Sequence, residues 1–320
     1  MKPVNNVNRL TVLLLLCSTT TLGQSPLRSN LWESGSTSAP QNEQASQVSE
    51  GQPCPRNRNR TAEVTYGDYA IRTYRHPDPE GCLQILKRGR VIYSLMSEDF
   101  RIGGNFSNDP GIPIGTDVTG AGLPDLVVGE WTGGAHCCFT LHVFELGKRF
   151  RVVGKIEADD SDGAQFIDLE HDGKYVFEGN DWVFAYWGTS FVNSPAPDIF
   201  LRYLDGRFRL ATDLMKKPEP SADEFAALVD EVRNDQWDLT DTTRPCGELK
   251  FCRIPVSLWR NMLKLLYIGH ADLAWRLLDK AWRLSPQRKQ AFANGFCKQL
   301  SQSHYWNDLH VWAGSCPGKD

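Results

Sequence analysis

Residues 124–158 read PDLVVGEWTGGAHCCFTLHVFELGKRFRVVGKIEA, and three short runs within them alternate apolar and polar residues. The runs are PDLVVGEW, CCFTLHVFEL and FRVVGKIEA. Alternation with a period of two is typical of β-strands that bury one face. The middle run begins at a histidine and two cysteines, His136, Cys137 and Cys138. This triplet has three interpretations: a metal site, a catalytic thiol beside its base, or disulfide anchors.

The same alternation extends on both sides of this stretch, from Ala62 to about Leu214. Further runs include AEVTYGDYAIRTY, KYVFEG, WVFAYW and DIFLRYLDGRFRLA, and glycine-bearing turns such as RGR, HDG and LDGR separate them. Short strands punctuated in this way predict a largely antiparallel β domain over residues 61–215. The absence of a strand–helix rhythm argues against a parallel nucleotide-binding sheet.

The pattern changes to helical spacing over residues 216–320. Ser221 and Glu224 have the spacing of a capping box, which predicts a helix from Ala222. A second helix is expected to end at Gly269, and Ser285 followed by proline opens another. The chain is therefore predicted to be an α+β protein in which a β domain precedes a small antiparallel helical domain.

Residues 258–286, LWRNMLKLLYIGHADLAWRLLDKAWRLSP, resemble one unit of a tetratricopeptide repeat. Gly269, Ala274, Ala281 and Pro286 carry the resemblance, whereas Met262 stands where that family has a small residue. Stable arrays of this kind need about three units. We therefore expect a single helical hairpin that packs on its neighbours. A repeat-type peptide groove is the alternative.

The beginning of the chain has the composition of an export signal. A positive segment, the apolar run LTVLLLLC and small residues follow one another, which predicts a cleaved signal peptide over residues 1–23. A lipid anchor on Cys17 is the alternative, although Leu16 precedes it where a small residue is expected. Residues 24–60 are rich in polar residues and predict a disordered linker. The expected location is secreted or periplasmic, and no transmembrane segment is expected.

The cysteines fit an oxidising compartment. Removal of Cys17 leaves an even number of them, which favours a disulfide framework in an exported chain. The eight remaining are Cys54, Cys82, Cys137, Cys138, Cys246, Cys252, Cys297 and Cys316. The net charge of −4 supplies no basic field, so nucleic acid is not an expected partner.

Two stretches of the β region share a pattern of oxygen-bearing side chains. DVTGAGLPDLVV begins at Asp117 and DLEHDGKYVFEG begins at Asp168, and each has a glycine at its sixth position, as in a Ca²⁺ loop. Both resemble the loops of FG-GAP and VCBS repeats, as found in uncharacterised secreted bacterial proteins. The resemblance implies calcium ligands at Asp117, Thr119, Asp125, Asp168, Glu170 and Asp172. Each loop lacks one expected oxygen, at Ala121 or Val176. The alternative is that the aspartates only shape tight turns.

The resemblance also bears on architecture, because a propeller blade takes about 40–50 residues. The two loops start about fifty residues apart, so the β region has room for three blade-like units. A closed propeller needs at least about four. We expect a blade-like or sandwich assembly.

Catalysis is the second hypothesis. In a strand, His136 shares a face with Cys138 but not with Cys137, and His142 lies about 20 Å along the chain, so no local three-ligand zinc site forms. Carboxylates on the loops are candidates for acid and base: Glu130, Asp159, Asp160, Asp162 and Glu178. Trp182, Phe184 and Tyr186 would share one face of a strand, either as core or as a sugar-stacking platform.

The first hypothesis is an exported, disulfide-stabilised, non-catalytic binding or surface protein with a protein or glycan partner. The alternative is an extracytoplasmic hydrolase acting on polysaccharide or peptide. A hydrolase requires a deep pocket with at least one perturbed carboxylate. The sequence leaves ligand, partner and oligomeric state open.

Overall fold

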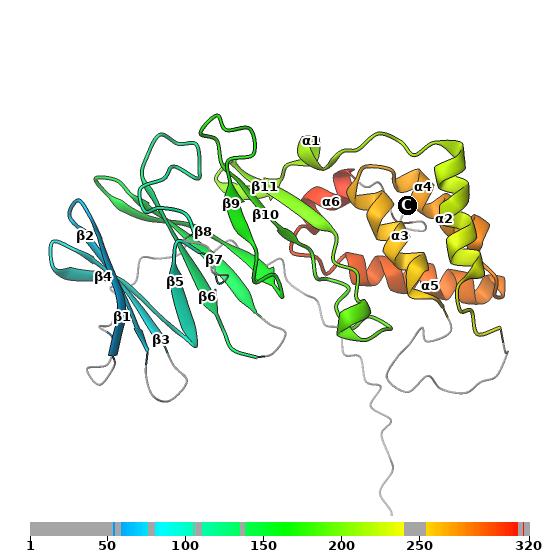
Figure 1. Ribbon diagram of the computed structural model, residues 1–320, viewed down its shortest axis with the longest axis horizontal. Helices are drawn as coiled ribbons and strands as arrows, with labels where there is room; N and C mark the ends of the chain where they lie inside the picture. The colour runs from blue at the N-terminus through cyan, green and yellow to red at the C-terminus, as the bar shows by residue number, and fades with distance from the viewer. Residues whose placement is uncertain are drawn as a thin grey trace, which may run out of the picture. The chain divides into compact units, whose positions relative to one another are not determined.

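The chain forms three antiparallel sheets followed by a layer of helices (Figure 1). The computed structural model describes residues 54, 59–75, 81–104, 106, 111–134, 138–239, 254–312 and 316. The predicted signal peptide and almost all of the predicted linker lie outside these residues. The α+β prediction is confirmed.

Each sheet has four strands that are neighbours in chain order, as in a propeller blade. Sheet A contains β1 (Asn59–Tyr66), β2 (Tyr69–Arg75), β3 (Gly81–Lys87) and β4 (Arg90–Ser97). Sheet B contains β5 (Asp99–Ile102), β6 (Asp125–Trp131), β7 (Phe139–Leu146) and β8 (Phe150–Asp159). Sheet C contains β9 (Gln165–Ile167), β10 (Val176–Asn180), β11 (Asp198–Leu204) and β12 (Arg207–Leu210). Three blade-like units therefore occupy the predicted β region.

Tight hairpin turns occur where glycine was expected to place them. Arg88–Gly89 joins β3 to β4, and Asp205–Gly206 joins β11 to β12. All four residues have positive φ angles, between 49° and 83°. Two successive positive φ angles match the right-handed twist of the flanking strands, and glycine adopts them without steric cost.

Sheet B is buried on both faces, which explains why its strands are so apolar. Leu126 and Val128 of β6 pack against sheet A in one core cluster. Val127, between them, belongs to a second cluster that includes sheet C and the helices. The two clusters lie on opposite sides of the sheet because neighbouring side chains point to opposite faces.

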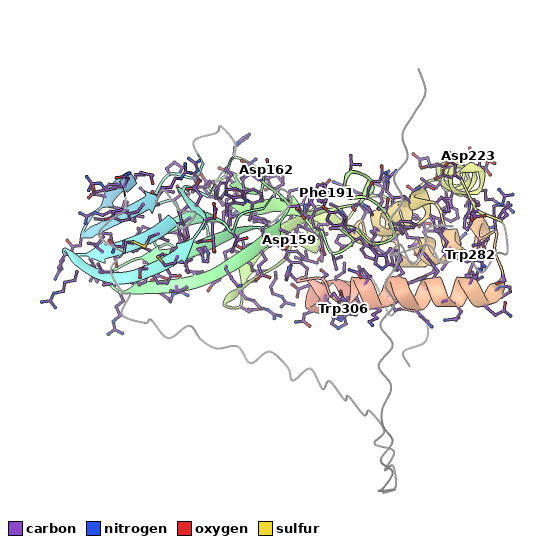
Figure 2. All side chains as sticks on the ribbon, turned by 90° about the horizontal axis from the view of Figure 1, so that it is seen from below. Asp159, Asp162, Phe191, Asp223, Trp282 and Trp306 are labelled. Atoms are coloured by element: carbon purple, nitrogen blue, oxygen red, sulfur yellow. A yellow bond between two sulfur atoms is a disulfide. The ribbon has the colours of Figure 1, made fainter. Side chains whose placement is uncertain are left out.

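The helical layer follows sheet C. It contains α1 (Thr212–Met215), α2 (Ala222–Asn234), α3 (Val256–Tyr267), α4 (Ala271–Ala281), α5 (Pro286–Leu300) and α6 (Trp306–Trp312). The capping box at Ser221 and Glu224 is present, and Gly269 follows α3 with φ +90°. Trp306 lies where the strands meet the helices, whereas Asp223 and Trp282 lie at the other end of this layer (Figure 2).

The aromatic run at residues 182–187 is not a strand, so the expectation of one shared face for Trp182, Phe184 and Tyr186 is wrong. Asp181 Oδ1 accepts the backbone N–H of Val183 at 3.0 Å, and successive turns follow. Phe184 is fully buried, whereas Tyr186 is 55% exposed. The side-chain cap at Asp181 starts a turn where alternation alone suggested a strand.

Two disulfides join the described cysteines, Cys54 to Cys82 and Cys297 to Cys316. Their Cα atoms are 6.0 Å and 5.9 Å apart. The first ties a residue of the predicted linker to β3, and the second ties α5 to the end of the chain. Cys138 is also disulfide-bonded. The other predicted disulfide cysteines, Cys137, Cys246 and Cys252, lie outside the described residues.

Replacement of Leu201 by alanine tests the shared core. Leu201 is 1% exposed on β11, whereas Leu204 on the same strand is 49% exposed. We expect Leu201→Ala to lower the free energy of unfolding by about 2–5 kcal/mol, because a buried cavity remains. Leu204→Ala should change it by about 0.5 kcal/mol or less. Urea unfolding measures both, and equal losses would contradict the assigned core.

Candidate functional site

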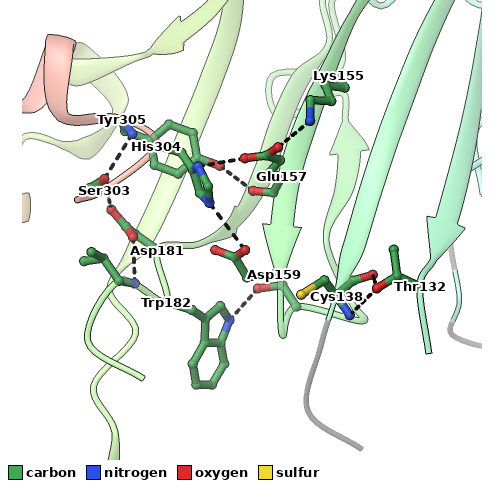
Figure 3. Close-up of polar contacts among 12 residues, drawn as sticks. Thr132, Cys138, Lys155, Glu157, Asp159, Asp181, Trp182, Ser303, His304 and Tyr305 are labelled. Carbon is green, nitrogen blue, oxygen red and sulfur yellow. Dashed lines mark hydrogen bonds and ion pairs between the residues drawn. The ribbon is translucent and has the colours of Figure 1, made fainter. Parts of the chain in front are cut away.

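A group of polar side chains lies where sheets B and C meet the end of α5 (Figure 3). β8 contributes two carboxylates, the segment after β10 one, α3 a tyrosine, and the α5–α6 turn the rest. We call this group the junction cluster: Glu157, Asp159, Asp181, Tyr267, Ser303, His304 and Tyr305. It combines the residue types that hydrolases use, so its hydrogen bonds decide what chemistry it can perform.

His304 lies between two carboxylates of β8. Its Nδ1 is 2.7 Å from Glu157 Oε2, and its Nε2 is 3.4 Å from Asp159 Oδ1. Hydrogen bonds to Asp159 and Glu157 outweigh desolvation and raise the pKa of His304 to about 10. The hydrogen bond from His304 is also the largest cause that lowers the pKa of Glu157 to about 2. At neutral pH the imidazolium is thus a cation held between two anions.

Asp181 is the buried centre of the cluster. Its Oδ2 accepts hydrogen bonds from Ser303 Oγ at 2.5 Å and from Tyr267 Oη at 2.6 Å. Burial raises the pKa of Asp181, and the bonds from Ser303 and Tyr267 act in the opposite direction. These bonds connect sheet C to α3 and to the α5–α6 turn. A buried carboxyl is tolerated because both donors satisfy it.

The hydroxyl of Ser303 is not paired with the imidazole of His304. Ser303 Oγ donates to Asp181 and accepts from the backbone N–H of Tyr305 at 3.0 Å. Both imidazole nitrogens of the neighbouring His304 face carboxylates instead of this hydroxyl. A serine nucleophile with a histidine base requires a hydrogen bond between the two, and Ser303 donates to buried Asp181 instead. The bonds of the junction cluster join β8 and the segment after β10 to α3 and the α5–α6 turn, and we call this set of contacts the clamp.

A second histidine and carboxylate pair lies between sheets A and B. His142 Nε2 donates to Glu130 Oε2 at 2.6 Å, across the β6–β7 hairpin. Burial raises the pKa of Glu130, but the hydrogen bonds from His142 and Ser97 exceed that effect, and the net pKa is lowered. Glu130, a proposed catalytic carboxylate, is thus occupied by a structural partner.

The first acidic loop uses its carboxylates to close its own turn. Asp117 accepts the backbone N–H groups of Ala121 and Gly122 at 3.2 Å and 2.7 Å. Asp125 Oδ2 accepts from the Thr119 hydroxyl at 3.0 Å and from two backbone N–H groups. Desolvation raises the pKa of Asp125 to about 6. These bonds are those expected of turn-shaping aspartates.

The second acidic loop repeats this arrangement. Asp168 accepts the backbone N–H groups of Asp172 and Gly173, each at 3.0 Å. Both loops line one cavity of about 490 Å³, to which Asp117, Thr119, Glu170 and Asp172 contribute. The structure thus brings together two segments that start about fifty residues apart. Over the described ranges, however, it groups no three His, Cys, Asp or Glu side chains in a geometry that would hold a metal.

Cys138 is the described residue of the His136–Cys138 triplet. β7 begins at Phe139, so Cys138 precedes the strand, and its backbone N–H donates to Thr132 Oγ1 at 3.2 Å. Its sulfur is committed to a disulfide, which removes it as a thiolate ligand or nucleophile. His136 and Cys137 lie outside the described residues, so a disulfide anchor at Cys137 stays a prediction.

A groove lies between α3 and sheet C. α3 presents Arg260, Leu263, Lys264 and Tyr267, which helical spacing of three and four residues places on one face, and Ile268 follows α3 directly. The opposite wall is formed by Phe200, Met215 and the segment from Pro195 to Asp198, and Lys217 completes the lining. The groove has a volume of about 770 Å³. Pockets of about 300–1,000 Å³ enclose small molecules in proteins.

Hydrogen bonds define both ends of this groove. Arg260 Nη2 donates to the carbonyl of Asn193 at 3.4 Å, which ties the 3₁₀ turn at Phe191–Asn193 to α3. At the other end, the N–H of Lys217 donates to the carbonyl of Ile268 at 3.3 Å. His270 Nε2 donates to the Lys217 carbonyl at 2.9 Å. The groove walls are therefore anchored to each other.

Reasoning from the sequence singled out Asp159 but missed its partner His304. The two residues are far apart in the chain, and SQSHYW, the segment that contains His304, has the composition of an ordinary polar turn. Asp181 directly precedes the aromatic run, and the basic residues of α3 carry no sequence signal of a binding site.

Comparisons with known proteins add no family to this description. No family model, no curated protein and no solved structure matches the chain. The geometry defines an α+β protein with three blade-like sheets, a salt-bridged junction and a groove beside a helix.

Replacement of His304 by glutamine tests the clamp. The raised pKa of His304 means that its stabilising effect is complete below pH 6.5 and is lost as the pH rises toward about 10. The lowered pKa of Glu157 has the opposite consequence, with stability complete above pH 4.5 and lost toward about 2. We expect His304→Gln to lower the free energy of unfolding by about 1 kcal/mol near pH 6, and by less at higher pH.

The measurement is urea unfolding at a series of pH values. His310→Gln, at an exposed position of α6, is the matched control and should leave the alkaline limb of the profile unchanged. The clamp would be contradicted if the free energy of unfolding of His304→Gln changed with alkaline pH in the same way as that of the unsubstituted chain.

Proposed function

We propose that this chain is an exported, disulfide-stabilised binding protein without catalytic activity, and that the groove between α3 and sheet C holds its ligand. The observation that carries the proposal is the groove itself. It combines an apolar floor, a volume suited to a small molecule and walls that are hydrogen-bonded to each other. Preformed walls reduce the ordering cost of binding.

The hydrolase alternative has less support. Asp125 and Asp181 are carboxyls with raised pKa values, as such an enzyme would require. Both are about 1% exposed, however, and neither is among the residues that line the three described cavities. A general acid must come within hydrogen-bond distance of its substrate. We therefore propose binding instead of hydrolysis.

Location outside the cytoplasm is supported by the disulfides. The Cys54–Cys82 and Cys297–Cys316 bonds are compatible with an oxidising compartment. In the described part of the chain, no helix has both the length and the hydropathy needed to span a bilayer. The cleaved signal peptide, and the lipid anchor on Cys17 as its alternative, remain part of the proposal.

Binding in the groove can be tested with Nile red, an uncharged apolar dye. We expect dye fluorescence to rise when the purified chain is added. The apparent affinity of the dye should fall at least about tenfold for Ile268→Trp, because the indole would fill a groove of this size. Leu204→Trp adds the same ring at an exposed position outside the groove and should retain binding. Thermal unfolding verifies that each variant is folded. Equal binding by both variants would place the dye elsewhere.

Calcium at the acidic loops is a separate part of the proposal. It is supported by the resemblance to FG-GAP loops and by the single cavity that both loops line. If a cation binds, the melting temperature should be higher in buffer with calcium than in buffer with chelator. The increase should grow with the logarithm of the ratio of the calcium concentration to Kd. Asp168→Ala should remove that difference, whereas Asp162→Ala, at an exposed position outside both loops, should retain it. Identical melting temperatures with calcium and with chelator would contradict calcium binding at these loops.

A further inference from the structure

We infer that the ligand of the groove is an amphiphilic anion, a molecule with a carboxylate or phosphate head and an apolar body. This inference rests on the proposed binding function. It follows from the distribution of charge around an apolar floor, and it identifies the chemical class of the ligand.

The rim of the groove is cationic. Lys217, Arg260 and Lys264 contribute their charged groups, and all three residues are exposed. Arg260 and Lys264 are four residues apart, so they project from the same face of α3. Asp198 is the one carboxylate among the lining residues, and it accepts a hydrogen bond from Asn180 Nδ2 at 2.9 Å.

Several other basic residues are already paired with carboxylates. Arg202 pairs with Asp213, Arg209 with Asp308 and Lys289 with Asp279. Across the described ranges, Lys217, Arg260 and Lys264 form no such ion pair with a carboxylate. Positive charge of this kind attracts an anion and gives it a defined position, with arginine able to bind an oxyanion through two N–H groups.

The floor of the groove is apolar and mostly buried. Leu263, Tyr267, Met215 and Pro195 are buried, and Phe200 and Ile268 are half-buried. The Tyr267 hydroxyl points away to Asp181, so its ring is the part available to a ligand. Burial of apolar surface contributes about 25 cal/mol per Å². A ligand that used only charge would leave this floor uncovered.

The size of the groove favours one small molecule over an extended chain. Its volume of about 770 Å³ lies within the range for small-molecule sites. Its two ends are bridged by the Arg260–Asn193 and Lys217–Ile268 hydrogen bonds. An apolar body of moderate length therefore fits along α3, with the anionic head beside Arg260 and Lys264.

The experiment measures displacement of a dansyl-labelled fatty acid from the purified full chain. Decanoate and decyl phosphate supply a charged head on an apolar chain, decanamide supplies the same length without charge, and acetate supplies charge without the chain. We expect at least one of the two amphiphilic anions to compete about tenfold better than decanamide, and acetate not to compete. A preference for either head group identifies which oxyanion the rim accepts.

The double variant Arg260→Gln with Lys264→Gln should weaken binding of the preferred anion about tenfold, since each exposed ion pair accounts for up to about fivefold. Because the variant also removes the Arg260–Asn193 hydrogen bond, the decisive quantity is the ratio of the affinity for the preferred anion to the affinity for decanamide, which should fall about tenfold. Lys280→Gln removes the same charge from an exposed position of α4 and is the matched control. All substitutions are at exposed positions, and circular dichroism confirms folding.

Two failures can be distinguished. Equal competition by decanamide and both anions, or an unchanged ratio of affinities in the double variant, would overturn the anionic ligand while Nile red binding continued to support the groove. Failure of both the labelled fatty acid and Nile red to bind would overturn the proposed binding function itself.

Discussion

The rest of the structure depends on the burial of sheet B on both faces. An antiparallel sheet commonly leaves one face to solvent, with apolar residues on the other. Here Val128 faces sheet A and Val127 faces the core shared with sheet C, so both sets of alternate residues must be covered. One neighbouring sheet is therefore required on each side. The order of the three sheets along the chain supplies those neighbours without a long crossover.

Sheet C packs against sheet B through apolar side chains, whereas its contacts with the helices include directed polar bonds. Phe177 and Leu201 are paired across strands and belong to the shared core, whereas Phe200, on the opposite face, lines the groove. On the helical side, the contacts include directed polar bonds, such as those from Tyr267 to Asp181 and from Arg209 to Asp308. Directed bonds fix the position of the helices without filling all the space between the layers. The groove occupies space left between these anchored contacts.

The sequence predicts those features of the fold that depend on local physics. Alternation located strands, glycines located the hairpin turns, and Ser221 with Glu224 located the start of α2. It failed at residues 182–187, because a single side-chain cap at Asp181 outweighed the local pattern. The junction cluster could not be predicted, since the position of His304 beside Glu157 depends on how two distant segments pack. Spacing within one segment carries no information about such contacts.

The residues that look most reactive are also those whose bonding is most complete. His304, Ser303 and Asp181 are the residue types of a hydrolase, yet each is held by the others or by β8 in hydrogen bonds that secure the helices. Lys217, Arg260 and Lys264 are chemically ordinary, but they surround an apolar surface that the chain leaves open. Recognition requires groups that the fold has not already satisfied, because a ligand must replace their water and not their protein partners. By that criterion, we propose α3 as the ligand-binding face, with the junction cluster as its support.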